Sequence, residues 1–299
     1  MLSRRTLLVG GAAATGVVVA GAAAGVGIEQ GVLPGRPTIQ AALGLNGPAG
    51  HIPHDVEPVL GLVNFFHSRD RLGARVGWTL FQPPDAGPDL PVVVALHGLG
   101  QDHDSAASTF GLGSFLASAI AHGVPPFAIA APDGGTSYWH PRPDGEDAGA
   151  MVVDELLPRL ARRGLDVSRI GLIGWSMGGY GALRLGGLLG PDRVAAVVAS
   201  SPAIWQHAED ASRSGFEDAA EYEAFTVVGH QHDLDGIAVR IDCGTGDPFY
   251  RDVQDYAEDF ARDAGLVSTF EPGAHDAAYW RRMLPAQLAF LGRGVVSSA

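Results

Sequence analysis

The stretch Gly174-Trp175-Ser176-Met177-Gly178 decides the fold of this 299-residue chain, because of what lies on either side of it. The residues before it, Arg-Ile-Gly-Leu-Ile, are typical of a short buried strand, and the residues after it are small and compatible with a helix. A serine at such a strand–turn–helix junction is typical of a nucleophile elbow, a strained turn that exposes the serine hydroxyl above a sheet. Because 42 residues of the chain are Gly, the G-x-S-x-G pattern is informative only in this context.

Two later loops contain the residues that such a serine needs. Asp247 lies in the turn after the strand-like run 237–243, and His275 lies in the loop after the next such run, 266–270. A serine hydroxyl is a poor nucleophile until an imidazole takes its proton and a buried carboxylate holds that imidazole in one tautomer. The order serine, acid, histidine therefore predicts a triad of Ser176, Asp247 and His275. The turn position favours Asp247 over the neighbouring carboxylates Asp242, Asp252 and Asp276.

Beyond these residues, the chain resembles the putative-esterase branch of the α/β-hydrolases, which includes mycobacterial mycolyltransferases, feruloyl esterases and S-formylglutathione hydrolases. The stretches with this resemblance are LHGLG at 96–100, PDGGTSYW at 132–139, GWSMGGYGAL at 174–183, CGTGDPF at 243–249 and GAHDAAYW at 273–280. The resemblance implies Ser176 as nucleophile, His275 as base and Asp247 as acid. It also implies that the backbone amides of Leu99 and Met177 form an oxyanion hole.

Three activities remain open within this resemblance. We favour a serine ester hydrolase that forms an acyl-enzyme, uses no cofactor and acts on a small-molecule or lipid acyl ester. One alternative is an acyltransferase of the mycolyltransferase type, and another is a non-catalytic binding protein on the same fold. The filled triad positions favour an enzyme, and the lack of a recognisable carbohydrate-binding stretch favours water as the acyl acceptor.

Composition excludes several other classes of function. The formal net charge of −13 argues against nucleic acid and against an anionic membrane surface as partners. The chain contains no Lys, which excludes a Schiff-base lysine, a P-loop lysine and a Ser–Lys dyad. Cys243 is the single cysteine, so no intramolecular disulfide is possible, and its place at a strand end predicts a core residue.

Two cofactor-dependent alternatives find little support in the sequence. His230-Gln231-His232-Asp233 resembles part of a binuclear zinc motif, but no further ligand pattern follows a strand. The G-x-G-x-x-G fingerprint of dinucleotide-binding enzymes does not occur. We therefore predict neither a metal site nor a nucleotide cofactor.

The N-terminal residues predict export. Arg4 and Arg5 form a twin-arginine-type region, and an uninterrupted run rich in Leu, Val, Ala and Gly follows them. We predict that residues 1–27 are a twin-arginine-type signal peptide or a retained membrane anchor, which places the protein outside the cell or in the cell envelope. Residues 28–57 are rich in Gly and Pro and predict a linker or an extended wrap, and residues 58–299 predict the catalytic domain.

Alternating apolar and amphipathic segments predict an α/β fold with a mostly parallel sheet and helices on both faces. We expect eight strands, at residues 59–66, 75–81, 91–96, 127–131, 170–173, 194–199, 237–243 and 266–270. Residues 202–236 are longer than a simple crossover and predict a small lid-like insertion that includes Trp205. Together with Tyr138 and Trp139, which follow the fourth strand, Trp205 is expected to line the substrate pocket.

Overall fold

A computed structural model describes residues 36–84, 87–260 and 265–296. The predicted signal or anchor at 1–27 and the first residues of the predicted linker lie outside the described residues. No helix of the described part of the chain is both long and apolar enough to cross a bilayer.

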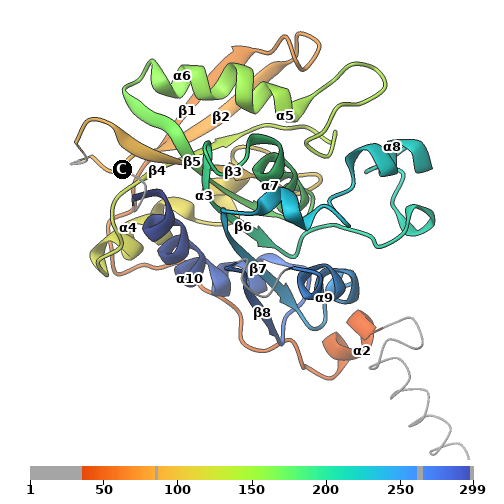
Figure 1. Ribbon diagram of the computed structural model, residues 1–299. Helices are drawn as coiled ribbons and strands as arrows, with labels where there is room; N and C mark the ends of the chain where they lie inside the picture. Colours follow the sequence, from red (N-terminus) through yellow and green to blue (C-terminus); the bar gives the residue numbers. More distant parts are fainter. Residues whose placement is uncertain (1–35, 85–86, 261–264, 297–299) are drawn as a thin grey trace, which may run out of the picture.

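The expected eight-stranded, mostly parallel sheet is confirmed (Figure 1). The strand order is β1-β2-β4-β3-β5-β6-β7-β8, with antiparallel pairing of β1 with β2 and of β2 with β4, and parallel pairing elsewhere. The strands are β1 Gly61–His67, β2 Arg75–Phe81, β3 Leu90–Leu96, β4 Ala128–Pro132, β5 Leu165–Trp175, β6 Val194–Ser200, β7 Ala238–Gly244 and β8 Val267–Glu271.

β5 differs most from the expectation, because it begins at Leu165 rather than at residue 170. Its first half contains Asp166, Ser168 and Arg169, which are not fully buried, so the apolar run detects only the second half. The pairing of β5 with β6 shifts register between Ile170 and Gly171, where the polar half of the strand meets the apolar half.

Helices cover both faces of the sheet (Figure 1). They are α2 Arg36–Ala42, α3 Ser105–Ser108, α4 Leu112–Ala121, α5 Ala148–Ala150, the π-helical turn Met151–Leu156, α6 Leu157–Ala161, α7 Met177–Leu189, α8 Ala219–Phe225, α9 Tyr250–Glu258, α10 Ala277–Val296, and the 3₁₀ turns Ala208–Asp210 and Gln231–Leu234.

The core has two parts, one on each face of the sheet, because successive residues of a strand point to opposite faces. Val92 and Val94 of β3 pack in a cluster with α7 and α9, whereas Val93 of the same strand packs in a cluster with α4 and α10. Both faces of the sheet are therefore covered by apolar clusters, which explains why the central strands β3 and β6 are continuous hydrophobic runs in the sequence.

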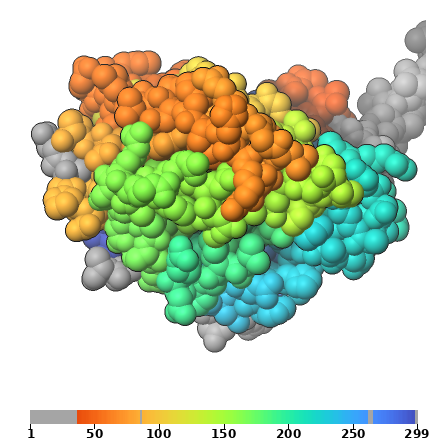
Figure 2. Space-filling model, turned by 90° about the horizontal axis from the view of Figure 1, so that it is seen from above, coloured from red at the N-terminus to blue at the C-terminus, as the bar shows by residue number. Residues whose placement is uncertain are grey.

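The loop after β4 lies between two other surface segments of the molecule. In Figure 2 this loop (yellow-green) lies between the β1–β2 hairpin (orange) and the 202–236 insertion (cyan). Ion pairs connect it to both sides: Arg71 Nη2 is 2.6 Å from Glu146 Oε1, and Arg142 Nη1 is 3.1 Å from Glu221 Oε1. The loop is thus held from two directions near the carboxyl edge of the sheet.

The chain between α2 and β1 lies against the rest of the domain. Gly50 N–H donates to Ala278 O at the start of α10 over 2.7 Å, and Val59 N–H donates to Gly113 O of α4 over 3.1 Å. A Cβ on Gly50 would lie 2.1 Å from the backbone nitrogen of Arg282, so this close approach requires glycine.

Candidate active site

Ser176 occupies a tight turn between β5 and α7. Its backbone has φ 55° and ψ −118°, a strained conformation for a residue with a side chain. Two glycines make the turn possible: a Cβ on Gly174 would lie 2.0 Å from Gly178 O, and a Cβ on Gly178 would lie 1.9 Å from Leu96 O. Ser176 N–H donates to Ser200 O over 3.0 Å, which ties the turn to β6. The strand–turn–helix geometry expected from the sequence is therefore present.

Ser176, His275 and Asp247 form a continuous hydrogen-bonded chain. His275 Nε2 is 2.8 Å from Ser176 Oγ, and His275 Nδ1 is 2.8 Å from Asp247 Oδ2. An ionised carboxylate only accepts, so Nδ1 carries the proton of a neutral ring and Nε2 is left to accept from the serine hydroxyl. The tertiary structure thus brings the three residues predicted from the sequence into contact from three separate loops.

Asp247 is buried and its second oxygen is also used. Its side chain is 0% exposed, and Asp247 Oδ1 accepts a hydrogen bond from Phe249 N–H over 2.9 Å. The His275 ring lies 5.0 Å from the Trp280 ring in an edge-to-face contact. These contacts fix both the carboxylate and the imidazole in position.

The other carboxylates considered from the sequence have different partners. Asp242 pairs with Arg240 over 2.8 Å and accepts from Gln287 Nε2, and burial raises the pKa of its carboxyl. Asp276 accepts from Tyr279 N–H at the start of α10. Asp252 accepts from Gln206, and burial raises its pKa. None of the three hydrogen-bonds the His275 ring in the described part of the chain.

The expected oxyanion amides lie on two segments that meet beside Ser176. Met177 is the first residue of α7, so its N–H has no acceptor within the helix. The loop with Leu99 approaches the same turn, since a Cβ on Gly98 would lie 3.5 Å from Ser176 Cβ and 3.2 Å from Trp175 O. Leu99 itself is 45% exposed.

A row of aromatic rings in contact extends from the His275 imidazole through the insertion to the loop after β4. Ring centroids are 5.3 Å apart for His275 and Phe249, 5.4 Å for Phe249 and Trp205, and 6.1 Å for Trp205 and Tyr138. Trp205 is partly exposed. Phe249 was not predicted from the sequence. Its place two residues after Asp247, in the same turn, was the available signal.

Tyr138 and Trp139 are both buried, although the sequence predicts that both line the substrate pocket. Both have φ 57°, which is rare for residues with large side chains, and Tyr138 is 4% exposed. Trp139 is completely buried, although the sequence suggested a pocket residue. Its indole packs on Gly134 and Gly181, where a Cβ would lie within 2.6 Å of the ring. In this structure Trp139 supports the loops beneath the site, because it has no exposed surface for a ligand.

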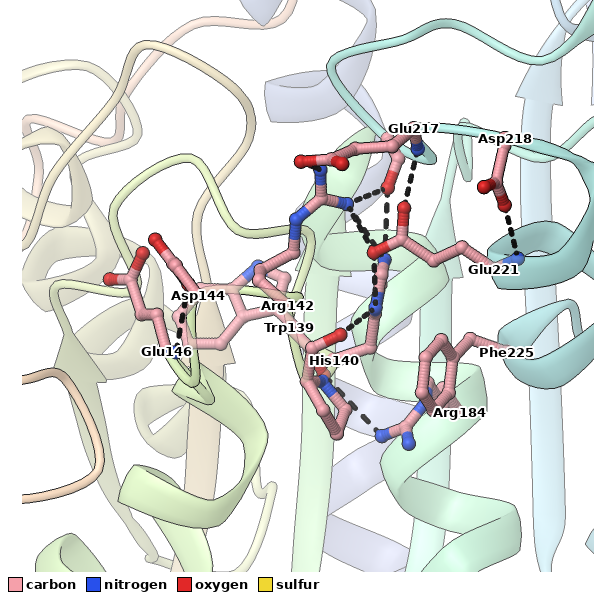
Figure 3. A network of polar contacts seen from close by, with 12 residues as sticks. Trp139, His140, Arg142, Asp144, Glu146, Arg184, Glu217, Asp218, Glu221 and Phe225 are labelled. Atoms are coloured by element: carbon pink, nitrogen blue, oxygen red, sulfur yellow. Dashed lines mark hydrogen bonds and ion pairs between the residues drawn. The ribbon is translucent and has the colours of Figure 1, made fainter.

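A buried polar network joins the loop after β4 to the insertion (Figure 3). His140 stacks between Phe216 and Phe225, with ring centroids at 5.1 and 4.8 Å, and its Nε2 lies 2.9 Å from Gly215 O. Arg142 contacts the same carbonyl as well as Glu221. Burial lowers the pKa of His140. The part of the insertion around Phe216 is thereby attached to the loop that positions Tyr138.

The residues considered for other chemistries lie elsewhere. Cys243 is buried, and burial raises the pKa of its thiol well above the usual range. His230 and His232 are largely exposed and lie beside Asp233. Within residues 36–84, 87–260 and 265–296, no group of three or more His, Cys, Asp or Glu side chains is arranged to hold a metal ion.

Comparison with known proteins agrees with this architecture. A ferulic acid esterase is similar in structure, with 23% identity, a TM-score of 0.65, and coverage of 78% of this chain and 98% of that chain. The fluorophosphonate-binding serine hydrolase F of Staphylococcus aureus, bound to substrate, is 19% identical with a TM-score of 0.66. The match covers 79% of this chain and 99% of that chain. An S-formylglutathione hydrolase from Agrobacterium tumefaciens is 19% identical with a TM-score of 0.67. The match covers 80% of this chain and 97% of that chain.

These likenesses confirm the α/β-hydrolase fold. No curated protein sequence matches the chain significantly. Residues 70–291, which are most of the chain and include all three residues of the hydrogen-bonded chain, match the protein family described as Putative esterase. The resemblance and the esterase class predicted from the sequence are thereby confirmed, and the chain belongs to the Putative esterase family of α/β-hydrolases.

Proposed function

We propose that this esterase is an exported serine hydrolase that cleaves acyl esters through a covalent intermediate on Ser176. The observation that supports the proposal is the chain of two 2.8 Å hydrogen bonds from Ser176 Oγ through His275 to the buried Asp247. The proposed nucleophile, base and orienting acid already lie within hydrogen-bonding distance of one another, and Ser176 occupies a strained turn between β5 and α7.

In the first half of the proposed reaction, Ser176 Oγ attacks the ester carbonyl while His275 Nε2 takes the hydroxyl proton. Asp247 stabilises the imidazolium that forms, because its Oδ2 accepts the Nδ1–H over 2.8 Å. The negative charge that develops on the carbonyl oxygen is stabilised by the N–H groups of Leu99 and Met177. His275 then gives its proton to the leaving alkoxide, which departs as an alcohol.

In the second half, water attacks the acyl-enzyme. His275 Nε2 takes a proton from the water, the oxygen–acyl bond to Ser176 breaks, and the proton returns to Ser176 Oγ as the acid leaves. Every proton and electron pair in this cycle is accounted for by the ester, water and the side chains of the chain, so the cycle needs no cofactor.

The nucleophile is tested by labelling with a fluorophosphonate probe and by turnover of chromogenic esters of increasing acyl length. We expect the wild-type protein to be labelled, and Ser176→Ala to lose labelling and at least about three orders of magnitude of turnover while keeping its melting temperature. Labelling that persists in Ser176→Ala would contradict the proposal.

Water is proposed as the acyl acceptor rather than a sugar hydroxyl, since no carbohydrate-binding stretch is recognisable in the sequence. The test incubates the protein with the same esters, with and without trehalose, and separates free acid from transferred ester by mass spectrometry. Dominant transfer would favour the acyltransferase, and absence of both turnover and labelling would favour a binding protein.

A further inference from the structure

A histidine outside the triad holds the loop that presents the Leu99 amide. His97 directly follows β3 and is 5% exposed. Its Nε2 lies 2.9 Å from Gly134 N, and its Nδ1 lies 2.8 Å from Gly98 O. A backbone N–H can only donate, so Nε2 is the acceptor, and the ring proton must be on Nδ1, where it donates to the Gly98 carbonyl. The two contacts together select one tautomer of a neutral ring.

The bond to Gly98 O has a direct consequence for Leu99. The Gly98 carbonyl and the Leu99 N–H belong to one planar trans peptide, so they point in opposite directions and turn together. Gln101 adds two contacts to the same turn: its N–H donates to Gly98 O over 3.1 Å, and its Oε1 accepts from Gly98 N–H over 2.9 Å. The Leu99 side chain is exposed and makes little contribution to fixing this peptide. The orientation of the Gly98–Leu99 peptide therefore depends on His97 and Gln101.

Trp139 provides the support behind His97. Its Nε1–H donates to His97 O over 3.3 Å, and its ring lies 5.2 Å from the imidazole at 64°. Because Trp139 is completely buried, the imidazole has a rigid neighbour on one side and the β4 loop on the other. Burial lowers the pKa of His97, in agreement with the neutral tautomer that the contacts require.

We propose that His97 is a positioning residue of the oxyanion hole, because its Nδ1–H holds the Gly98 carbonyl so that the Leu99 N–H points at the developing oxyanion. The inference rests on the proposed serine esterase function. An oxyanion donor contributes to the rate only when it is aimed before the reaction begins. Loss of a whole donor costs about 10²- to 10³-fold in kcat, so loss of its alignment should cost about 10- to 100-fold.

The test compares two substitutions that keep opposite halves of the imidazole. The amide of His97→Asn lies near the former Nδ1 and is able to donate to Gly98 O, whereas the amide of His97→Gln lies near the former Nε2 and faces Gly134 instead. We expect kcat of His97→Gln to fall about 10- to 100-fold with little change in KM, and His97→Asn to keep most of it. Fluorophosphonate labelling should slow in parallel, because the phosphoryl oxygen uses the same donors. Equal losses in both variants, accompanied by equal losses of melting temperature, would overturn the proposal.

A second pair applies if His97→Gln does not fold. Gln101 lies on a surface loop, and Gln101→Glu keeps an acceptor for Gly98 N–H whereas Gln101→Leu removes it. Support requires a lower kcat at unchanged KM for Gln101→Leu relative to Gln101→Glu, and equal kcat values would overturn the proposal. The two levels of failure are distinct: a wild-type protein without labelling or turnover refutes the proposed function and with it this inference. If the wild-type protein is active and the paired variants have equal kcat values, only this inference is refuted and the proposed function stands.

Discussion

Replacing Asp247 with Asn tests the orientation of His275 most sharply, because the structure shows that both carboxylate oxygens act as acceptors. Oδ1 accepts from Phe249 N–H over 2.9 Å and Oδ2 accepts from His275 Nδ1 over 2.8 Å, at a side chain with no solvent exposure. An amide has a single acceptor oxygen. If that oxygen faces His275, the amide NH₂ faces Phe249 N–H, which leaves a buried backbone donor unpaired at a cost of about 1 to 3 kcal/mol.

The favoured orientation of Asp247→Asn therefore keeps the bond to Phe249 and turns the NH₂ toward His275. Nδ1 then accepts, the ring proton moves to Nε2, and Nε2 loses the ability to take the proton of Ser176. A preference of about 1 to 3 kcal/mol leaves only about one molecule in 5 to 150 with the productive tautomer. Loss of the carboxylate charge opposite the imidazolium adds to this, so kcat should fall about 10³- to 10⁴-fold.

The assay measures kcat and KM on a short-chain chromogenic ester, with the melting temperature as a check of folding. Asp276→Asn is the matched control: it changes the neighbouring carboxylate, keeps a side-chain oxygen for Tyr279 N–H, and should leave kcat within about threefold. A folded Asp247→Asn protein with more than about a tenth of the wild-type kcat would refute the reasoning about the tautomer.

Three further predictions concern stability and export. Because burial lowers the pKa of His97 from its usual 6.5, the unfolded chain takes up a proton below pH 6.5 that the folded state does not. The free energy of unfolding should therefore decrease by up to about 1.4 kcal/mol per pH unit as the pH falls below 6.5. His97→Asn should show a weaker dependence of this free energy on pH, measured by urea denaturation at several pH values. Gly178→Ala should destabilise the fold by more than about 3 kcal/mol, since its Cβ would lie 1.9 Å from Leu96 O, whereas Gly87→Ala, with open space around it, should not change the melting temperature. Arg4→Lys combined with Arg5→Lys should retain the protein in the cytoplasm in a fractionation experiment, and unchanged export would indicate a general signal or an anchor.

The sequence by itself determined the class of fold and the identity of the triad candidates. Strands buried on both faces are apolar, so β3 and β6 are visible in the sequence as continuous hydrophobic runs. Ser176, Asp247 and His275 each follow a strand of the parallel part of the sheet, namely β5, β7 and β8, and the carboxyl ends of parallel strands meet at one edge of the sheet. The position of these residues in space could therefore be predicted from the sequence, because each lies within a few residues of the end of a strand.

Only the tertiary structure decided which residues support the site. β4 lies between β2 and β3 in space, although it follows β3 in the chain, and this order is what brings Gly134 N–H to His97. Trp139 follows Tyr138 directly, yet the positive φ of both residues breaks the usual alternation of side chains, so their exposure cannot be read from spacing. The contacts of Phe249 and of the buried His140 likewise depend on how the 202–236 insertion packs. Hydrogen bonds and packing between segments far apart in the chain leave no periodic signal in the sequence. For this reason the candidate triad could be predicted from the sequence, whereas the residues that hold its loops in place could not.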